Sequence, residues 1–197
     1  MPEISHQPLL VLPVSEPRDH VLGSLKAPAV LVEYGDYQCP YCRHARHTVQ
    51  YLRDQMGDQL CFVFRHFPLS QIHEHAQRAA EAAEAAGAQG RFWPMHEMLF
   101  DHQENLDDAS LADSAAELGL DINRFNAELV AGNHAARVRE DFMSGVRSGV
   151  NGTPTFFING LRYDGFNDVE SLMSAIVTGM ALPPHARHPS HSHRVSS

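Results

Sequence analysis

The sequence has few cysteines, fewer basic than acidic residues and no long hydrophobic run. Its 197 residues include 3 cysteines, too few and odd in number for the disulfide framework of a secreted scaffold. With 24 acidic and 15 basic residues, the formal net charge is -9, so the chain is a poor partner for nucleic acid. Hydrophobic residues still make up 43% of the chain, which is enough for a globular core.

The N-terminal segment also lacks the features of an export signal. No Lys or Arg precedes the short apolar run over Leu9–Val14, and no run approaches the length of a membrane span. We therefore expect a cytoplasmic protein without a membrane partner. Prolines are frequent in residues 1–27 and predict an extended lead-in, in which Leu9–Val14 could add an edge strand.

The first half of the predicted domain, residues 28–70, reads as strand, helix and strand. A β-rich apolar run at 29–34 is followed by a helix that begins near Cys39 and runs to about residue 56. A second apolar run at 60–64 completes a βαβ unit.

The remaining chain alternates between helical and strand patterns. Residues 71–148 carry apolar spacings near 3.6 and an alanine-rich run, which predict a helical insertion. Residues 149–180 predict a hairpin, turning at Asn159-Gly160, and a last amphipathic helix. The His-rich tail, residues 181–197, predicts disorder, with metal binding by its histidines as the weaker alternative.

The most reactive feature of the sequence is Cys39-Pro40-Tyr41-Cys42, a C-x-x-C motif at the start of the first helix. Free N–H groups and the dipole at a helix N-terminus stabilise a thiolate, and Arg43 and His44 would add positive charge. We expect Cys39 to be the exposed, attacking sulfur and Cys42 the resolving sulfur. Cys61, inside the second strand, is expected to be a buried structural thiol.

A C-x-x-C motif alone also fits half of a zinc site. No second C-x-x-C is present, so the remaining ligands would have to come from histidines. The candidates are His44, His47, His66, His73 and His75.

Several separated features together resemble one family. The chain is similar to the DsbA-like branch of the thioredoxin superfamily in its Cys-Pro-Tyr-Cys motif, in Phe64-Arg65-His66-Phe67-Pro68 and in Gly152-Thr153-Pro154-Thr155. The resemblance covers about residues 17–178. It implies an α/β thioredoxin fold with an all-helical insertion between its βαβ and ββα halves.

The resemblance also implies roles for individual residues. Cys39 and Cys42 match the redox pair, and Pro154 matches a cis-proline whose preceding residue, Thr153, would bind an extended substrate peptide. Pro40 and Tyr41 would also contact substrate. Glu33 matches a buried acid that exchanges a proton with the resolving cysteine, whereas an exposed strand-edge glutamate is the alternative interpretation.

These residues predict a thiol-disulfide oxidoreductase that acts on protein or peptide thiols and disulfides and needs no cofactor. A glutathione or thioredoxin-like system could serve as redox partner, and the motif leaves open oxidation, reduction or isomerisation. The alternative function is a thioredoxin-fold binding or chaperone module whose dithiol holds a client or a metal. A relative that modifies a small molecule is disfavoured, because such relatives generally lack a resolving cysteine.

Overall fold

A five-stranded mixed sheet forms the centre of the molecule. The computed structural model describes residues 8–181, and its strands lie in the order β1-β3-β2-β4-β5. Strands β2 and β3 run parallel, as the predicted βαβ unit requires, and the other neighbours are antiparallel. The strands are β1 (His20–Leu22), β2 (Ala29–Gly35), β3 (Leu60–His66), β4 (Thr155–Ile158) and β5 (Leu161–Tyr163).

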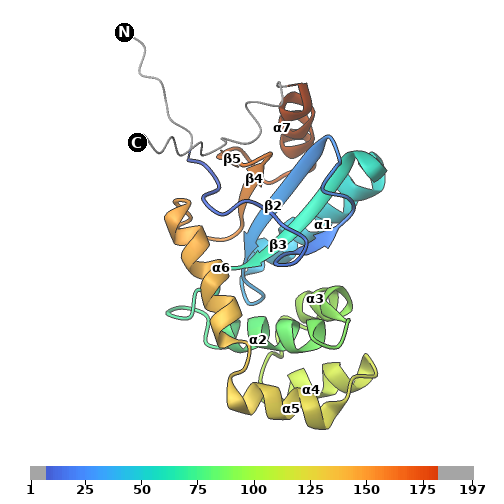
Figure 1. The fold of residues 1–197 in the computed structure, drawn as a ribbon, viewed down its shortest axis with the longest axis vertical. Coiled ribbons are helices and arrows are strands. Elements are labelled where there is room, and N and C mark those ends of the chain that lie inside the picture. The colour runs from blue at the N-terminus through green and yellow to red at the C-terminus, as the bar shows by residue number, and fades with distance from the viewer. Residues whose placement is uncertain (1–7, 182–197) are drawn as a thin grey trace, which may run out of the picture.

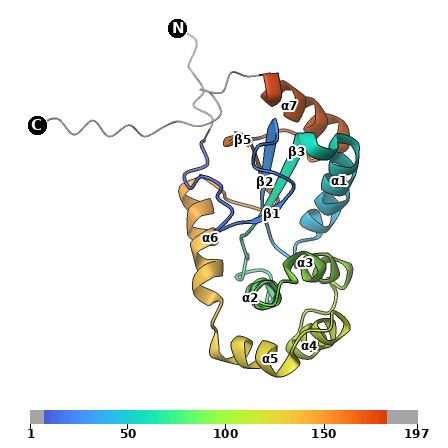
Figure 2. The same cartoon turned by 45° about the vertical axis from the view of Figure 1, so that its right-hand side comes forward.

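Helices cover the sheet and form a second body below it (Figure 1). Helices α1 and α7 lie on one face and α6 on the other, whereas α2 to α5 gather beyond the end of the sheet at which β2 and β3 finish (Figures 1 and 2). This arrangement agrees with the predicted α/β class, in which a helical insertion separates the two halves of the sheet. The helices are α1 (Pro40–Met56), the 3₁₀ turn η1 (Gly57–Gln59), α2 (Ala76–Gly87), α3 (Phe92–Asp101), α4 (Asp108–Glu117), α5 (Ile122–Ala131), α6 (Ala135–Arg147) and α7 (Val169–Ala181).

Alternation along β2 decides which of its side chains face α1, the helix that begins with the C-x-x-C motif. Successive side chains of a strand point to opposite faces. Leu31 packs in the cluster that contains Cys42 of α1, whereas Val32 and Tyr34 pack in the cluster on the α6 face. Glu33 is two residues from Leu31 and therefore lies on the α1 face, where a charged side chain has little access to water.

Helix α6 approaches the opposite face closely because it carries a glycine at the contact. A Cβ at Gly145 would lie 2.8 Å from the Phe67 ring and 3.0 Å from the Tyr34 ring. The Tyr34 hydroxyl also forms a 2.7 Å hydrogen bond with the Ser144 hydroxyl. These contacts hold α6 against β2 and the chain that leaves β3.

The edge strand expected at Leu9–Val14 is not formed, and β1 at His20–Leu22 takes the edge beside β3. Only Leu9 makes a bridge, an isolated one to Leu161. Further along the segment, the Leu12 and Pro13 carbonyls accept hydrogen bonds from the buried Arg65 guanidinium, at 2.8 and 3.3 Å. The segment therefore caps a buried cation instead of extending the sheet.

Within residues 8–181, no helix combines the length and the apolar character needed to cross a membrane. The predicted His-rich tail falls almost entirely outside the described residues, and so do the first seven residues of the lead-in.

Candidate redox site

The two cysteines of the motif lie at the N-terminal end of α1. Cys39 is the N-cap residue, with an extended backbone, and Pro40 occupies the first helical turn, where its missing N–H costs no hydrogen bond. Both cysteines are free thiols in this structure. Cys39 keeps 3% of its accessible surface and Cys42 keeps none. Cys39 is therefore buried and not exposed as expected, although it is the more accessible cysteine of the pair.

Cys39 is strongly acidic for a thiol. The hydrogen bond with the Cys42 side chain contributes most, and hydrogen bonds from Thr153 and from the backbone of Cys42 and Tyr41 add to it. Against the opposing effect of burial, they lower the pKa of Cys39 to about 5. Arg43, which we expected to assist, instead forms a 3.0 Å ion pair with Glu104.

Cys42 has the opposite character. Burial, followed by its hydrogen bond to Cys39 and the charges of Glu33 and Cys39, raises the pKa of Cys42 well above its usual value. The backbone N–H of Asp36 lies 3.4 Å from its sulfur. Near neutral pH the pair therefore consists of one thiolate and one thiol, which is the arrangement that thiol-disulfide exchange uses.

Glu33 is the buried acid that the family resemblance implies. It is 2% exposed, and its Oε1 atom has no hydrogen-bond partner. Burial, and then the charge of Cys39, raise the pKa of Glu33 to about 8. A carboxyl group with such a pKa accepts and returns a proton near neutral pH. The alternative of a strand-edge glutamate facing solvent is excluded.

The chain before β4 completes the surroundings of Cys39. The Thr153–Pro154 peptide bond is cis, as expected, and the Cys39 sulfur lies 3.4 Å from the Thr153 carbonyl oxygen. The Thr153 hydroxyl is buried and makes no hydrogen bond with any other group, so it can donate to the Cys39 thiolate, whose pKa it lowers. Pro40 and Tyr41 are exposed, Tyr41 by 74%. Of the residues predicted to contact substrate, Thr153 therefore borders the Cys39 sulfur, and Pro40 and Tyr41 are the next two residues of the chain after Cys39.

Asp36 is a site residue that the sequence interpretation missed. Its buried carboxylate accepts hydrogen bonds from the Gln38 and Leu69 N–H groups, at 2.7 and 2.8 Å, and contacts His73 Nδ1 at 2.8 Å. Asp36 thus fastens the segment that enters α1 to the loop after β3. The Asp-x-Gln spacing, in which a side chain bonds to the backbone two residues on, was the available signal.

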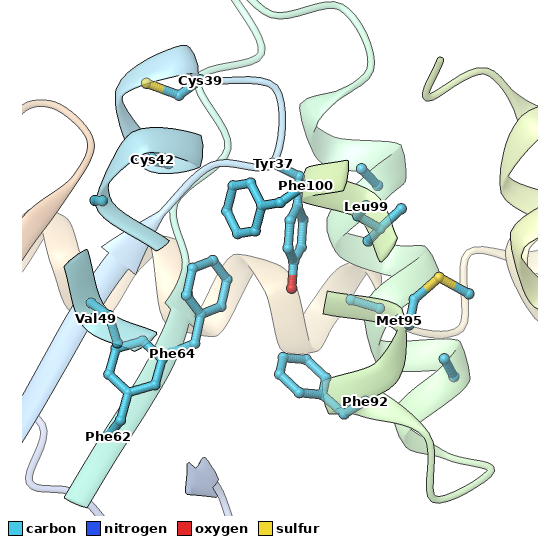
Figure 3. Packing of buried hydrophobic residues seen from close by; sticks show 14 of the residues in the cluster. Tyr37, Cys39, Cys42, Val49, Phe62, Phe64, Phe92, Met95, Leu99 and Phe100 are labelled. Atoms are coloured by element: carbon cyan, nitrogen blue, oxygen red, sulfur yellow. The ribbon is translucent and has the colours of Figure 1, made fainter. Parts of the chain in front are cut away.

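The helical insertion also forms hydrogen bonds with residues 37–39, the segment that leads into α1. The Gln103 side-chain amide donates to the Tyr37 and Cys39 carbonyl oxygens, at 2.7 and 2.9 Å. The Tyr37 ring projects toward α3 beside Phe100 (Figure 3), and its hydroxyl lies 3.0 Å from His96 Nδ1. No local pattern could reveal Gln103, because it lies 64 residues from Cys39 in sequence.

The zinc alternative gains no support from the described residues. Their one cluster with metal-ligand spacing consists of His66, Glu84 and Asp141, and it contains neither cysteine of the motif. Arg18 and Arg137 already pair with Asp141. The cluster is a buried ion-pair network between the sheet and the helices.

Comparison with known families agrees with this geometry. A family model described as Thioredoxin matches residues 15–177. The chain belongs to this thioredoxin family. Among solved structures, a thioredoxin-like oxidoreductase from Silicibacter pomeroyi is 29% identical with a TM-score of 0.76, over 85% of this chain and 95% of that one. BdbD from Bacillus subtilis is 24% identical with a TM-score of 0.74, over 88% and 96%. The predicted thioredoxin fold and the predicted membership of the thioredoxin superfamily are therefore confirmed. The fold is shared with alpha-DsbA1 from Wolbachia pipientis, which is 22% identical with a TM-score of 0.71 over 87% of this chain and 94% of that one.

Several curated relatives of this thioredoxin-family chain are named as sodium/proton antiporters. A Na(+)/H(+) antiporter NhaA 1 from Salinispora arenicola is 45% identical over 87% of this chain, but over only 26% of its own length. An NhaA antiporter from Herminiimonas arsenicoxydans is 41% identical over 86% of this chain and 27% of its own length. The chain thus spans about a quarter of these relatives.

Proposed function

We propose that this thioredoxin-family protein exchanges disulfides with protein or peptide substrates through Cys39 and Cys42. The observation that carries the proposal is the contrast between the two sulfurs. One is a thiolate with a pKa of about 5, and the other is a buried thiol hydrogen-bonded to it with a raised pKa. Sodium/proton exchange is not proposed, because the similarity spans only about a quarter of the antiporter relatives.

In the reducing direction, the Cys39 thiolate attacks one sulfur of a substrate disulfide and expels the other as a thiolate. This step forms a mixed disulfide between Cys39 and the substrate. The mixed disulfide removes the negative charge of Cys39, which is the second cause of the raised pKa of Glu33, and so favours the carboxylate form of Glu33. This carboxylate then takes the proton of Cys42, and the Cys42 thiolate attacks the Cys39 sulfur. The substrate leaves as a thiolate, and Cys39 and Cys42 become a disulfide. Oxidation of a substrate dithiol follows the same steps in reverse.

The bordering residues would hold the substrate during these steps. The cis Thr153–Pro154 segment offers backbone beside Cys39 to an extended peptide, which pairs with it as an added strand would. Pro40 and Tyr41 offer exposed apolar surface next to the attacking sulfur. No cofactor takes part, since the two sulfurs carry the electrons. Glutathione or a thioredoxin-like system would restore the pair.

Reduction of insulin by dithiothreitol tests the proposal. We expect the protein to accelerate it, Cys39→Ser to abolish the acceleration, and Cys42→Ser to accumulate a mixed disulfide. Cys61→Ser is the matched control, because Cys61 is fully buried and its pKa is raised to about 11, mainly by burial. Client binding that survives Cys39→Ser, without catalysis by the wild type, would instead favour the binding or chaperone module. The cytoplasmic location remains a prediction, which cell fractionation tests.

A further inference from the structure

A groove lies between the loop that follows β3 and one side of α6. It has a volume of about 620 Å³, which is within the range of ligand-binding pockets. Nine residues line it, and most of the lining is apolar: Pro68, Leu69, Ser70, Gln71, Ile72 and Gln77 on one side, and Ala135, Arg139 and Phe142 on the other. The three α6 residues are four and three positions apart, so they share one helix face.

Several apolar side chains that line the groove are exposed or only half-buried. Ile72 is 74% exposed, and Leu69 and Phe142 are half-buried. Phe142 stacks on the buried Phe67 ring with 4.4 Å between ring centroids, which makes the floor of the groove firm. Apolar surface in a preformed groove is favourable for binding, because covering it removes that surface from water.

Hydrogen bonds hold one wall of the groove to residues 36–38, the segment that leads into Cys39. The Leu69 N–H donates to the Asp36 carboxylate, and His73 Nδ1 contacts the same oxygen, both at 2.8 Å. Six residues after Leu69, the His75 N–H donates to the Gln38 side chain at 2.7 Å. Gln38 directly precedes Cys39, and Asp36 lies three residues before it. The loop that forms this wall is therefore held at both ends to the segment that leads into Cys39.

The charge in the groove indicates the chemistry of its occupant. Arg139 is the only charged residue among the nine that line it. Its side chain is exposed, and within residues 8–181 it has neither an ion pair nor a hydrogen bond. Its neighbours on α6, Arg137 and Glu140, are both paired. An unpaired guanidinium at an apolar groove complements a carboxylate.

We propose that this groove binds a segment of the protein substrate that combines apolar side chains with an acidic one, while a cysteine of that substrate reacts at Cys39. The inference rests on the proposed function and extends it to the class of substrate. Apolar side chains of the segment cover Ile72, Leu69 and Phe142, and its carboxylate pairs with Arg139.

The test follows a single step with synthetic peptides. Each peptide carries one cysteine as a mixed disulfide with thionitrobenzoate, followed by a Gly-Ser spacer of varied length and either a Leu-Asp-Leu or a Leu-Lys-Leu segment. The Cys39 thiolate of the reduced protein attacks the peptide sulfur, the S–S bond breaks, and thionitrobenzoate leaves with the electron pair. Its absorbance gives the second-order rate constant. The free dithiobis reagent, which has no peptide, measures the reactivity of Cys39 alone.

We expect the wild type to prefer the acidic peptide over the lysine peptide about three- to fivefold, as one exposed ion pair allows. Arg139→Glu should reverse this preference. Ile72→Ser should slow both peptides about tenfold, because the apolar contact is lost. Val130→Ser is the matched control, since Val130 is 83% exposed on α5 and does not line the groove. All variants should react with the free reagent at the wild-type rate.

Equal rates for the two peptides in both the wild type and Arg139→Glu, at every spacer length, would overturn the inference while the proposed function stood. A wild type that reacts with neither peptides nor free reagent would instead overturn the proposed function, and this inference with it. Sedimentation of the wild type as a dimer that Ile72→Ser dissociates would assign the groove to a second copy of the chain and also overturn the inference.

Discussion

Replacing Glu33 by Gln should raise the free energy of unfolding, relative to that of the wild type, as pH rises from acidic values to neutral. The wild-type carboxyl group is 2% exposed, and its pKa is raised from 4.5 to about 8, first by burial and then by the charge of Cys39. The amide of Gln keeps the size of the side chain but cannot ionise. The variant therefore no longer has a carboxylate whose ionisation inside the fold costs free energy.

The sign of the effect follows from proton binding. Between pH 4.5 and about 8 the folded protein keeps the Glu33 proton, whereas the unfolded chain loses it. The unfolded state binds fewer protons in this window, so the wild-type free energy of unfolding falls as pH rises. From the shift, the loss between about pH 4.5 and pH 7 amounts to about 3 kcal/mol. Glu33→Gln abolishes it.

Urea unfolding of both reduced proteins at about pH 4.5 and about pH 7 measures the effect. Any constant cost of the buried amide, which has no evident partner, cancels when the two pH values are compared. Glu117→Gln, at the exposed end of α4, is the matched control and should show no such change. If the stability difference between the wild type and Glu33→Gln were the same at both pH values, Glu33 would have an ordinary pKa, and the reasoning would be refuted.

Three further predictions concern the surroundings of the pair. Gln103→Leu removes two hydrogen bonds to the Tyr37 and Cys39 carbonyls. The variant should lose about 2–4 kcal/mol of stability in urea unfolding and should reduce insulin more slowly. Wild-type values in both assays would contradict the role of Gln103. Glu84 has a lowered pKa: burial opposes the shift, but hydrogen bonds with His20 and His66 outweigh it. Its contribution to stability should therefore be present above pH 4.5 and decline as pH falls below it, and Glu84→Gln should flatten the acid limb of thermal unfolding; an unchanged limb would contradict this. Glu33→Gln should also slow release of the mixed disulfide near neutral pH, and an unchanged release rate in rapid-quench experiments would exclude Glu33 as the proton acceptor.

Local patterns in the sequence were sufficient for the framework of the site. The β-rich run before Cys39 and the proline at the first helical turn place the motif at a helix N-terminus, and the structure has α1 begin at Pro40. The burial of Glu33, by contrast, was expected from the family resemblance, and alternation along β2 places this residue on the α1 face. Asp121 caps α5 in the same local way, because its side chain accepts a hydrogen bond from the Arg124 N–H at 3.0 Å. Such features depend on a few neighbouring residues.

Contacts between distant segments could not be predicted in the same way. The edge strand expected at Leu9–Val14 fails because Leu12 and Pro13 bond to Arg65, about 50 residues on. Cys39 is less exposed than expected, since Thr153 approaches it from the other half of the fold. The positive charge expected from Arg43 goes to Glu104 in the helical insertion. In each case tertiary packing supplies a partner that no local pattern contains.

The acidity of Cys39 is the central claim, and the pH dependence of its alkylation tests it most directly. The reduced protein is treated with iodoacetamide over a range of pH, and mass spectrometry assigns the modified cysteine. The rate at Cys39 should rise through a pKa of about 5, with Cys42 and Cys61 unmodified in the folded protein. A Cys39 rate that rises only near pH 9, the ordinary thiol value, or preferential modification of Cys42, would contradict the account.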